Sequence, residues 1–183
     1  NPLSWRLPSL LFGFANIGLA AWVTKLTFKS VRAAWIAAAL VAVDGFFIAY
    51  SRSALLDGMI VAFGMAGMGL VMGGSSLGAA LAAGVCVGCA ISCKLNGLVF
   101  LGTTALVCLA SPRLRRYTPV LIAAAAMVFY LQAAAALILT GRSGTLMAVI
   151  AENRAMVKRH LSYTIVHPFS SHWYTWFLPK RPI

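Results

Sequence analysis

Residues 118–140 read TPVLIAAAAMVFYLQAAAALILT and contain no charged side chain. An α-helix needs about 20 apolar residues to cross the ~30 Å hydrocarbon core of a bilayer, and this run is long enough. Five more apolar runs precede it, at 7–24, 33–50, 54–72, 77–93 and 95–110. The sequence therefore predicts an all-α, polytopic membrane bundle with about six transmembrane helices.

The composition supports a membrane protein. Hydrophobic residues make up 61% of the 183 residues and charged residues only 10%, whereas soluble domains carry about 25% charged residues. Lys and Arg number 15 against 3 Asp and Glu, which gives a net charge of +12. These cations interrupt apolar runs and do not line a polar face, so we expect membrane lipid as a partner and no nucleic acid.

Two boundaries divide the chain. A single helix over 77–110 would be about 51 Å long, so the Asn96-Gly97 turn signal predicts a break near Lys94. After residue 140 the sequence becomes basic and aromatic. We therefore predict a transmembrane bundle over 1–140 and an extracytoplasmic interfacial segment over 141–183.

The basic residues suggest an orientation. The short loops 25–32 and 112–117 hold six basic residues and, with six spans, lie on one side, which the positive-inside rule makes cytoplasmic. The opposite side holds the other nine basic residues, and six of these lie in the long segment 141–183, which the rule weights less.

Ionisable residues gather at the predicted outer face. They are Arg6, Asp44, Arg52, Asp57 and Lys94. A charge at membrane depth costs about 2.5–3.5 kcal/mol on insertion scales, so several at one level indicate a site for an anionic ligand. The alternatives are structural: Arg52 could pair with an aspartate and hold its turn, and Lys94 could extend to the lipid headgroups.

Metal and nucleotide chemistry are not predicted. Cys86, Cys89 and Cys93 lie within an apolar run, which favours packing, and the spacing of the three histidines matches no zinc motif. The chain also has no glycine-rich nucleotide loop. We expect neither a metal nor a cofactor.

Small residues predict close helix packing. Two pairs have the small-x3-small spacing that lets helix backbones approach in lipid: Gly74 with Gly78, and Gly84 with Gly88. The aromatic stretch 170–177 either forms an interfacial belt or stacks on a sugar ring.

Several short motifs follow one another in a specific order. They are Asn1-Pro2, Trp5-Arg6, Pro8-Ser9, Phe12-Gly13, Asp44-Gly45, Ser51-Arg52, Leu55-Leu56-Asp57, Ser92-x-Lys94-x2-Gly97-Leu98, Arg154-Ala155-Met156, His160, His167-Pro168-Phe169-Ser170-Ser171, Trp173-Tyr174-Thr175-Trp176 and Arg181-Pro182. In these motifs the chain resembles the dolichyl- or polyprenyl-phosphate-mannose–protein mannosyltransferases, membrane enzymes with a GT-C type fold. It departs from the family pattern at His172, Tyr174 and Phe177. Only 24 residues separate Arg142 from His167, which leaves no room for a large inserted domain. In this respect the chain resembles the bacterial branch of the family.

The resemblance implies an activity. A sugar on a lipid phosphate is attacked by a Ser or Thr hydroxyl of an acceptor protein, a carboxylate removes the proton, and the lipid phosphate leaves. The catalytic residue is unknown, because the family's acidic pair is expected upstream of Asn1. The implied substrate-binding residues are Arg6, Arg52 and Lys94 for phosphate or sugar, Asp57 and then Asp44 for a sugar hydroxyl or for positioning Arg52, and His167 and Trp173 for the acceptor or sugar side.

The resemblance also implies a location. We expect the bacterial cytoplasmic membrane with the site facing outside, or the endoplasmic reticulum membrane in a eukaryote.

The family's acidic loop and later spans are not in this sequence, so the 183-residue chain alone is expected to be inactive. The alternatives are a secondary transporter or channel subunit and a non-catalytic membrane scaffold.

Overall fold

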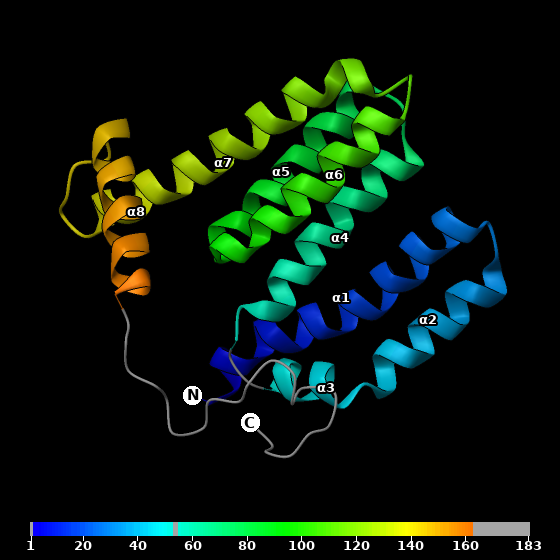
Figure 1. The fold of residues 1–183 in the computed structure, drawn as a ribbon. Helices are drawn as coiled ribbons and strands as arrows, with labels where there is room; N and C mark the ends of the chain where they lie inside the picture. The colour runs from blue at the N-terminus through cyan, green and yellow to red at the C-terminus, as the bar shows by residue number, and fades with distance from the viewer. Residues whose placement is uncertain (1, 53–54, 163–183) are drawn as a thin grey trace. The chain divides into compact units, whose positions relative to one another are not determined.

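The structure is a computed structural model that describes residues 2–52 and 55–162 (Figure 1). The described residues form helices joined by turns and contain no β-strand, which confirms the all-α prediction for this part of the chain. The chain divides into two compact units, Asn1–Gly144 and Thr145–Ile183.

The described residues of the first unit form seven α-helices and two short 3₁₀ turns. The α-helices are α1 (Pro2–Phe28), α2 (Val31–Val43), α3 (Gly45–Arg52), α4 (Asp57–Gly73), α5 (Leu77–Cys93), α6 (Leu98–Ala110) and α7 (Thr118–Leu139), and the 3₁₀ turns are η1 (Leu95–Gly97) and η2 (Arg115–Tyr117). In the second unit the described residues form α8 (Leu146–Leu161).

Helices α1, α2, α4, α5 and α7 make the main packing contacts, and α2 packs on α1. Helix α4 packs on both α1 and α5, and α5 packs in turn on α7 (Figure 1). Helices α1 and α4 run parallel, because Asn16 contacts Gly58 near the start of α4 and Trp22 lies against Gly69 further along. A buried cluster joins α4 to α7 and consists of Val71, Ala83, Cys108, Leu114 and Leu121.

One of the two predicted glycine pairs makes a helix contact. A Cβ at Gly84 would lie 2.5 Å from the carbonyl oxygen of Leu121, and one at Gly88 would lie 2.8 Å from that of Ala125. Only glycine lets α5 approach α7 this closely, so the prediction for Gly84 and Gly88 is confirmed. It is wrong for the other pair: Gly74 ends α4, Gly78 lies in the exposed first turn of α5, and so the two are not on one helix.

The break predicted near Lys94 is confirmed. Helix α5 ends at Cys93, η1 follows, and α6 begins at Leu98.

A second break falls inside the run 33–50, which was expected to be one span. Helix α2 ends at Val43 after 13 residues and α3 has 8, so they are about 20 and 12 Å long. The side chain of Asp44 accepts a hydrogen bond from the backbone N–H of Phe47 (3.0 Å), which starts a new helix there.

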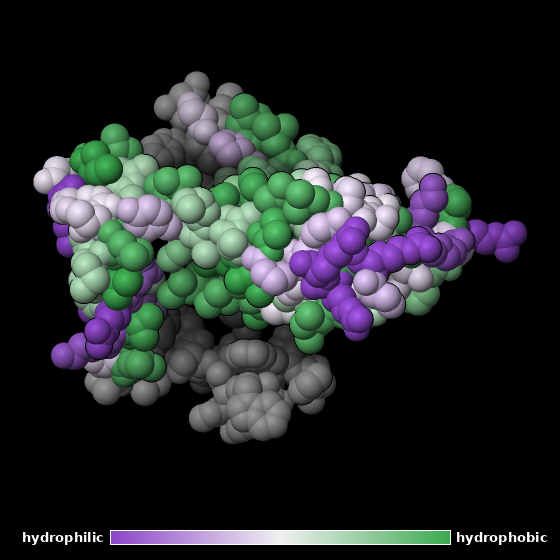
Figure 2. All heavy atoms as spheres, turned by 90° about the horizontal axis from the view of Figure 1, so that it is seen from above, coloured by the Kyte–Doolittle hydropathy of each residue, from purple (hydrophilic) through white to green (hydrophobic). Residues whose placement is uncertain are grey.

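Two helical stretches of the described chain are long and apolar enough to cross a membrane by themselves. They are Arg6–Phe28, with 23 residues, and Arg115–Leu139, with 25. Four other apolar helical stretches are shorter: Val31–Val43, Asp57–Gly73, Leu77–Cys93 and Leu95–Ala110. Large apolar side chains such as Trp35 and Leu106 are exposed, and the face drawn in Figure 2 is largely hydrophobic. Such a surface is suited to contact with lipid.

Candidate functional site

An ion pair joins the start of α4 to the end of α5. Lys94 Nζ lies 3.4 Å from Asp57 Oδ1, and the two side chains remain 52% and 40% exposed. The sequence places these residues 37 positions apart, so the antiparallel packing of α4 on α5 brings them together. Two residues that the sequence assigns to the candidate site are therefore in contact.

Helix dipoles favour both charges of this pair. Asp57 is in the first turn of α4, as expected from the sequence, and no side chain caps this helix at Leu56. Lys94 is the residue at which α5 ends. A carboxylate is stabilised at the positive end of a helix and an ammonium group at the negative end, by about 0.3–1 kcal/mol each. The pair therefore stabilises two helix ends at once, and yet it is open enough to solvent for an anion to reach Lys94.

Arg52 lies beside this pair in the chain but is not part of it. It ends α3 and is exposed, and within residues 2–52 and 55–162 it makes no ion pair. The idea that Arg52 only holds its turn by pairing with Asp57 is therefore not supported, because the carboxylate of Asp57 binds Lys94. The guanidinium of Arg52 is available for an anionic ligand.

Asp44 has a local role. Its carboxylate caps α3, and its carbonyl oxygen accepts from the N–H of Ile48 at 3.0 Å. The 8 residues of α3, about 12 Å, separate it from Arg52. The structure therefore places Asp44 at the far end of α3 from Arg52, and the pairing of these two residues considered from the sequence is wrong.

Arg6 is in the first turns of α1, at the same end of the unit as Asp57. Ser9, one turn later, donates a long hydrogen bond to the carbonyl oxygen of Leu55 (3.5 Å), and a Cβ at Gly13 would lie 2.6 Å from Ser51 Cβ. The start of α1 thus lies against the segment that carries Arg52 and Asp57. Arg6 itself is exposed and makes no ion pair with another described residue.

A buried asparagine at this end was missed by the sequence analysis. Asn16 is 1% exposed, and its Nδ2 donates to the carbonyl oxygen of Gly58 at 2.9 Å. This bond ties α1 to the first turn of α4, next to Asp57. A single asparagine inside an otherwise apolar run was the available signal. Ser92, two residues before Lys94, has a buried hydroxyl without a partner among the described residues.

The predicted cytoplasmic loops lie at the opposite end of the unit. Leu26 near the end of α1 packs beside Gly73 at the end of α4, and Leu114 packs in one cluster with Val71. The basic residues at this end are Lys25, Lys29, Arg32, Arg113, Arg115 and Arg116. Two groups of cations therefore occupy opposite ends of the helices.

Two predicted site residues, His167 and Trp173, lie outside the described residues, as does the aromatic stretch 170–177. Their proposed contacts with acceptor or sugar stay predictions. Within the part of the chain that the structure describes, no three His, Cys, Asp or Glu side chains are grouped as ligands of a metal ion would be.

The described residues define a class: an all-α protein with apolar helices of membrane length and with cations at both ends of its helices. The model of the dolichyl-phosphate-mannose–protein mannosyltransferase family matches residues 1–152, and the chain belongs to this family. The match contains Arg6, Arg52, Asp57 and Lys94. No curated protein and no solved structure matches the chain significantly.

Proposed function

We propose that the end of the unit that carries Asp57 and Lys94 binds the phosphate of a lipid-linked mannose, for transfer to Ser or Thr hydroxyls of proteins. Family membership supports the donor and the type of acceptor. The observation that carries the proposal is the exposed Lys94–Asp57 pair, with Arg52 on the adjoining segment.

The strength of the ion pair suits this role. Pairs as exposed as Lys94–Asp57 contribute only about 0.2–1 kcal/mol to stability. A lipid phosphate carries a full negative charge and several acceptor oxygens, so it can replace the carboxylate as a partner of Lys94. Asp57 is then released to accept a hydrogen bond from a sugar hydroxyl.

The reaction we propose is a displacement at the anomeric carbon. The acceptor oxygen forms a bond to this carbon as its proton passes to a carboxylate, and the bond between the carbon and the phosphate oxygen breaks. The phosphate leaves with the bonding electrons, and Lys94 and Arg52 stabilise its growing charge. As in inverting glycosidases, one displacement inverts the anomeric configuration. The step needs no cofactor, and a carboxylate serves as the base.

The membrane arrangement belongs to the same proposal. The apolar segments cross the bilayer six times, with α2 and α3 together forming the second crossing. The end with Lys94 then faces the extracytoplasmic side, in the bacterial cytoplasmic membrane or the endoplasmic reticulum. Arg6 adds a further cation at this face, and His167 and Trp173 shape the acceptor or sugar side.

Substitution of the two cations tests the proposal. In membranes that contain the full-length enzyme, we expect Lys94→Ala and Arg52→Ala each to lower kcat/KM for the lipid-linked sugar by about 10- to 100-fold, because a hydrogen bond to a charged group contributes about 1.5–3 kcal/mol. Transfer of radiolabelled mannose to a Ser/Thr peptide measures the effect, at matched expression.

Two controls sharpen this experiment. Arg113→Ala removes a cation from the opposite end and is expected to leave kcat/KM unchanged. A photoreactive polyprenyl-phosphate mannose should crosslink near Arg52 or Lys94. Undiminished transfer by both variants would exclude these residues as the phosphate site. Crosslinking at the Arg113 end alone would contradict the proposed placement of the donor.

A further inference from the structure

Helix α8 has an exposed apolar stripe. Leu146, Ile150, Val157 and Leu161 recur at helical spacing along one side, and their exposed fractions are 58%, 43%, 44% and 82%. Met147, at the edge of the stripe, is 75% exposed. Apolar surface left in water costs about 25 cal/mol per Å², so this stripe requires a cover.

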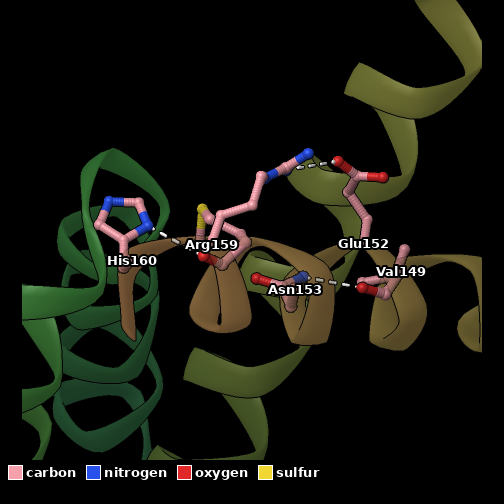
Figure 3. A network of polar contacts seen from close by, with 6 residues as sticks. Val149, Glu152, Asn153, Arg159 and His160 are labelled. Carbon is pink, nitrogen blue, oxygen red and sulfur yellow. Dashed lines mark hydrogen bonds and ion pairs between the residues drawn. The ribbon is translucent and has the colours of Figure 1, made fainter. Parts of the chain in front are cut away.

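Unpaired cations border the same stripe. Arg154 lies one turn after Ile150, and Lys158 lies one turn after Arg154, so both are at one edge of the stripe. Within the described residues neither makes an ion pair. The remaining charges of α8 are used elsewhere on the helix: Arg159 Nη2 lies 3.3 Å from Glu152 Oε1 (Figure 3).

Helix α8 follows an apolar helix of membrane length in the chain. Helix α7 ends at Leu139, and Gly141, at φ 73°, turns the chain sharply. The linker then folds back, because the hydroxyl of Tyr130 donates to the carbonyl oxygen of Gly144 at 3.2 Å. Tyr130 is nine residues before the end of α7, about 13 Å along the helix. Two residues after Gly144, α8 begins at Leu146, so only a short linker of six residues joins it to a helix of membrane length.

We propose that α8 lies in the membrane interface, with its apolar stripe among the acyl chains and with Arg154 and Lys158 bound to anionic phospholipid headgroups. An apolar stripe flanked by cations is the pattern of interfacial helices. The charges fit this occupant, since the three cations of α8 exceed its single carboxylate by 3 − 1 = +2. The inference does not depend on the transferase activity.

Helix depth is tested with a fluorescent amino acid at Ile150, in the stripe, or at Ala155, five residues later on the other side of α8. The whole protein is reconstituted in bilayers of phosphatidylcholine and phosphatidylglycerol, and brominated acyl chains serve as quenchers. We expect a blue-shifted, strongly quenched emission at Ile150 and neither effect at Ala155. Equal quenching at both positions would overturn the proposed orientation. A blue shift at Ile150 without lipid quenching would show a protein partner in place of lipid, and would also overturn it.

The charge requirement is tested by the double variant Arg154→Gln and Lys158→Gln, with Arg159→Gln as the matched control. A cation near an anionic surface contributes about 1 kcal/mol to binding. Phosphatidylglycerol should therefore strengthen the binding of α8 to the bilayer about 30-fold less in the double variant than in the parent protein. Quenching at Ile150, titrated against the phosphatidylglycerol content, measures this gain. Arg159→Gln should keep most of it. An equal loss in both variants, or no loss in the double variant, contradicts headgroup binding by Arg154 and Lys158.

Discussion

Individual polar side chains fix how α1, α4 and α5 meet. The amide of Asn16 binds the backbone of α4 at Gly58, and the adjacent residue, Asp57, binds Lys94. Interhelical hydrogen bonds in membrane proteins average about 0.6 kcal/mol and reach about 1.7, because the unfolded chain in lipid also finds partners. The stability they give is modest, but each one selects a register between two helices.

Asn16→Ala tests this register bond. The variant loses the hydrogen bond to Gly58 and the packing of a buried side chain. It also removes Asn16 Oδ1, a buried oxygen without a hydrogen-bond partner, and this removal offsets part of the loss. We expect the free energy of unfolding to fall by about 1–2 kcal/mol. Thr103→Ala is the control, because its exposed hydroxyl donates only within its own helix, to the carbonyl oxygens of Val99 and Phe100. Unfolding in mixed micelles measures both, and an equal response of the two variants would contradict the role of Asn16.

Part of this residue-scale arrangement was predictable. The sequence placed Asp57 in a first helical turn and Lys94 at a helix end, since turn signals lie beside both. It did not predict their contact. Arg52 is only five positions from Asp57 and was the closer candidate along the chain, whereas the actual partner is brought in by the packing of α4 on α5. Hydropathy and spacing do not reveal which helices are neighbours.

At the scale of helices, small residues decide the closest contact. Helix α5 presents Gly84 and Gly88 to α7, and the neighbouring atoms are largely backbone, which cannot move aside. We expect Gly84→Ala and Gly88→Ala each to lower the free energy of unfolding by about 1–3 kcal/mol, the range for overpacking in a core. Thermal unfolding in detergent measures the effect.

Gly102→Ala is the matched control for these two substitutions. Gly102 is also inside an apolar helix, α6, but nothing lies within 4 Å of a Cβ at this position. Alanine should be neutral or should stabilise by about 0.4–1 kcal/mol, because it restricts the unfolded chain. If all three alanine variants lose stability equally, helix packing at Gly84 and Gly88 is not the cause.

The number and length of helices were harder to predict than their type. The apolar runs predicted the all-α class, and the length of 77–110 together with the Asn96-Gly97 turn signal predicted the break at Lys94. The run 33–50, however, contains a helix end that hydropathy averages away. The break arises from one side chain: Asp44 caps α3, so α2 and α3 do not form a continuous helix. Asp44-Gly45 was a local signal for this break, and the apolar residues around it obscured the signal.

For the whole molecule, the remaining question is which end faces the cytoplasm. The end with Lys25, Lys29 and the 111–117 turn carries short basic loops, which favour the cytoplasm. The other end carries Arg52 and Lys94. If these residues bind the phosphate of the donor, this end lies on the extracytoplasmic side.

Labelling of single cysteines in intact cells decides this orientation. Asn96→Cys and Pro112→Cys place exposed thiols at opposite ends without removing a cation. The native cysteines are buried or half-buried in α5 and α6, so the parent protein gives the background. A membrane-impermeant maleimide should react at position 96 in intact cells and at position 112 only after permeabilisation, because charge retains the short basic loops in the cytoplasm. The reverse pattern would place Lys94 in the cytoplasm, where it could not bind a donor on the extracytoplasmic face.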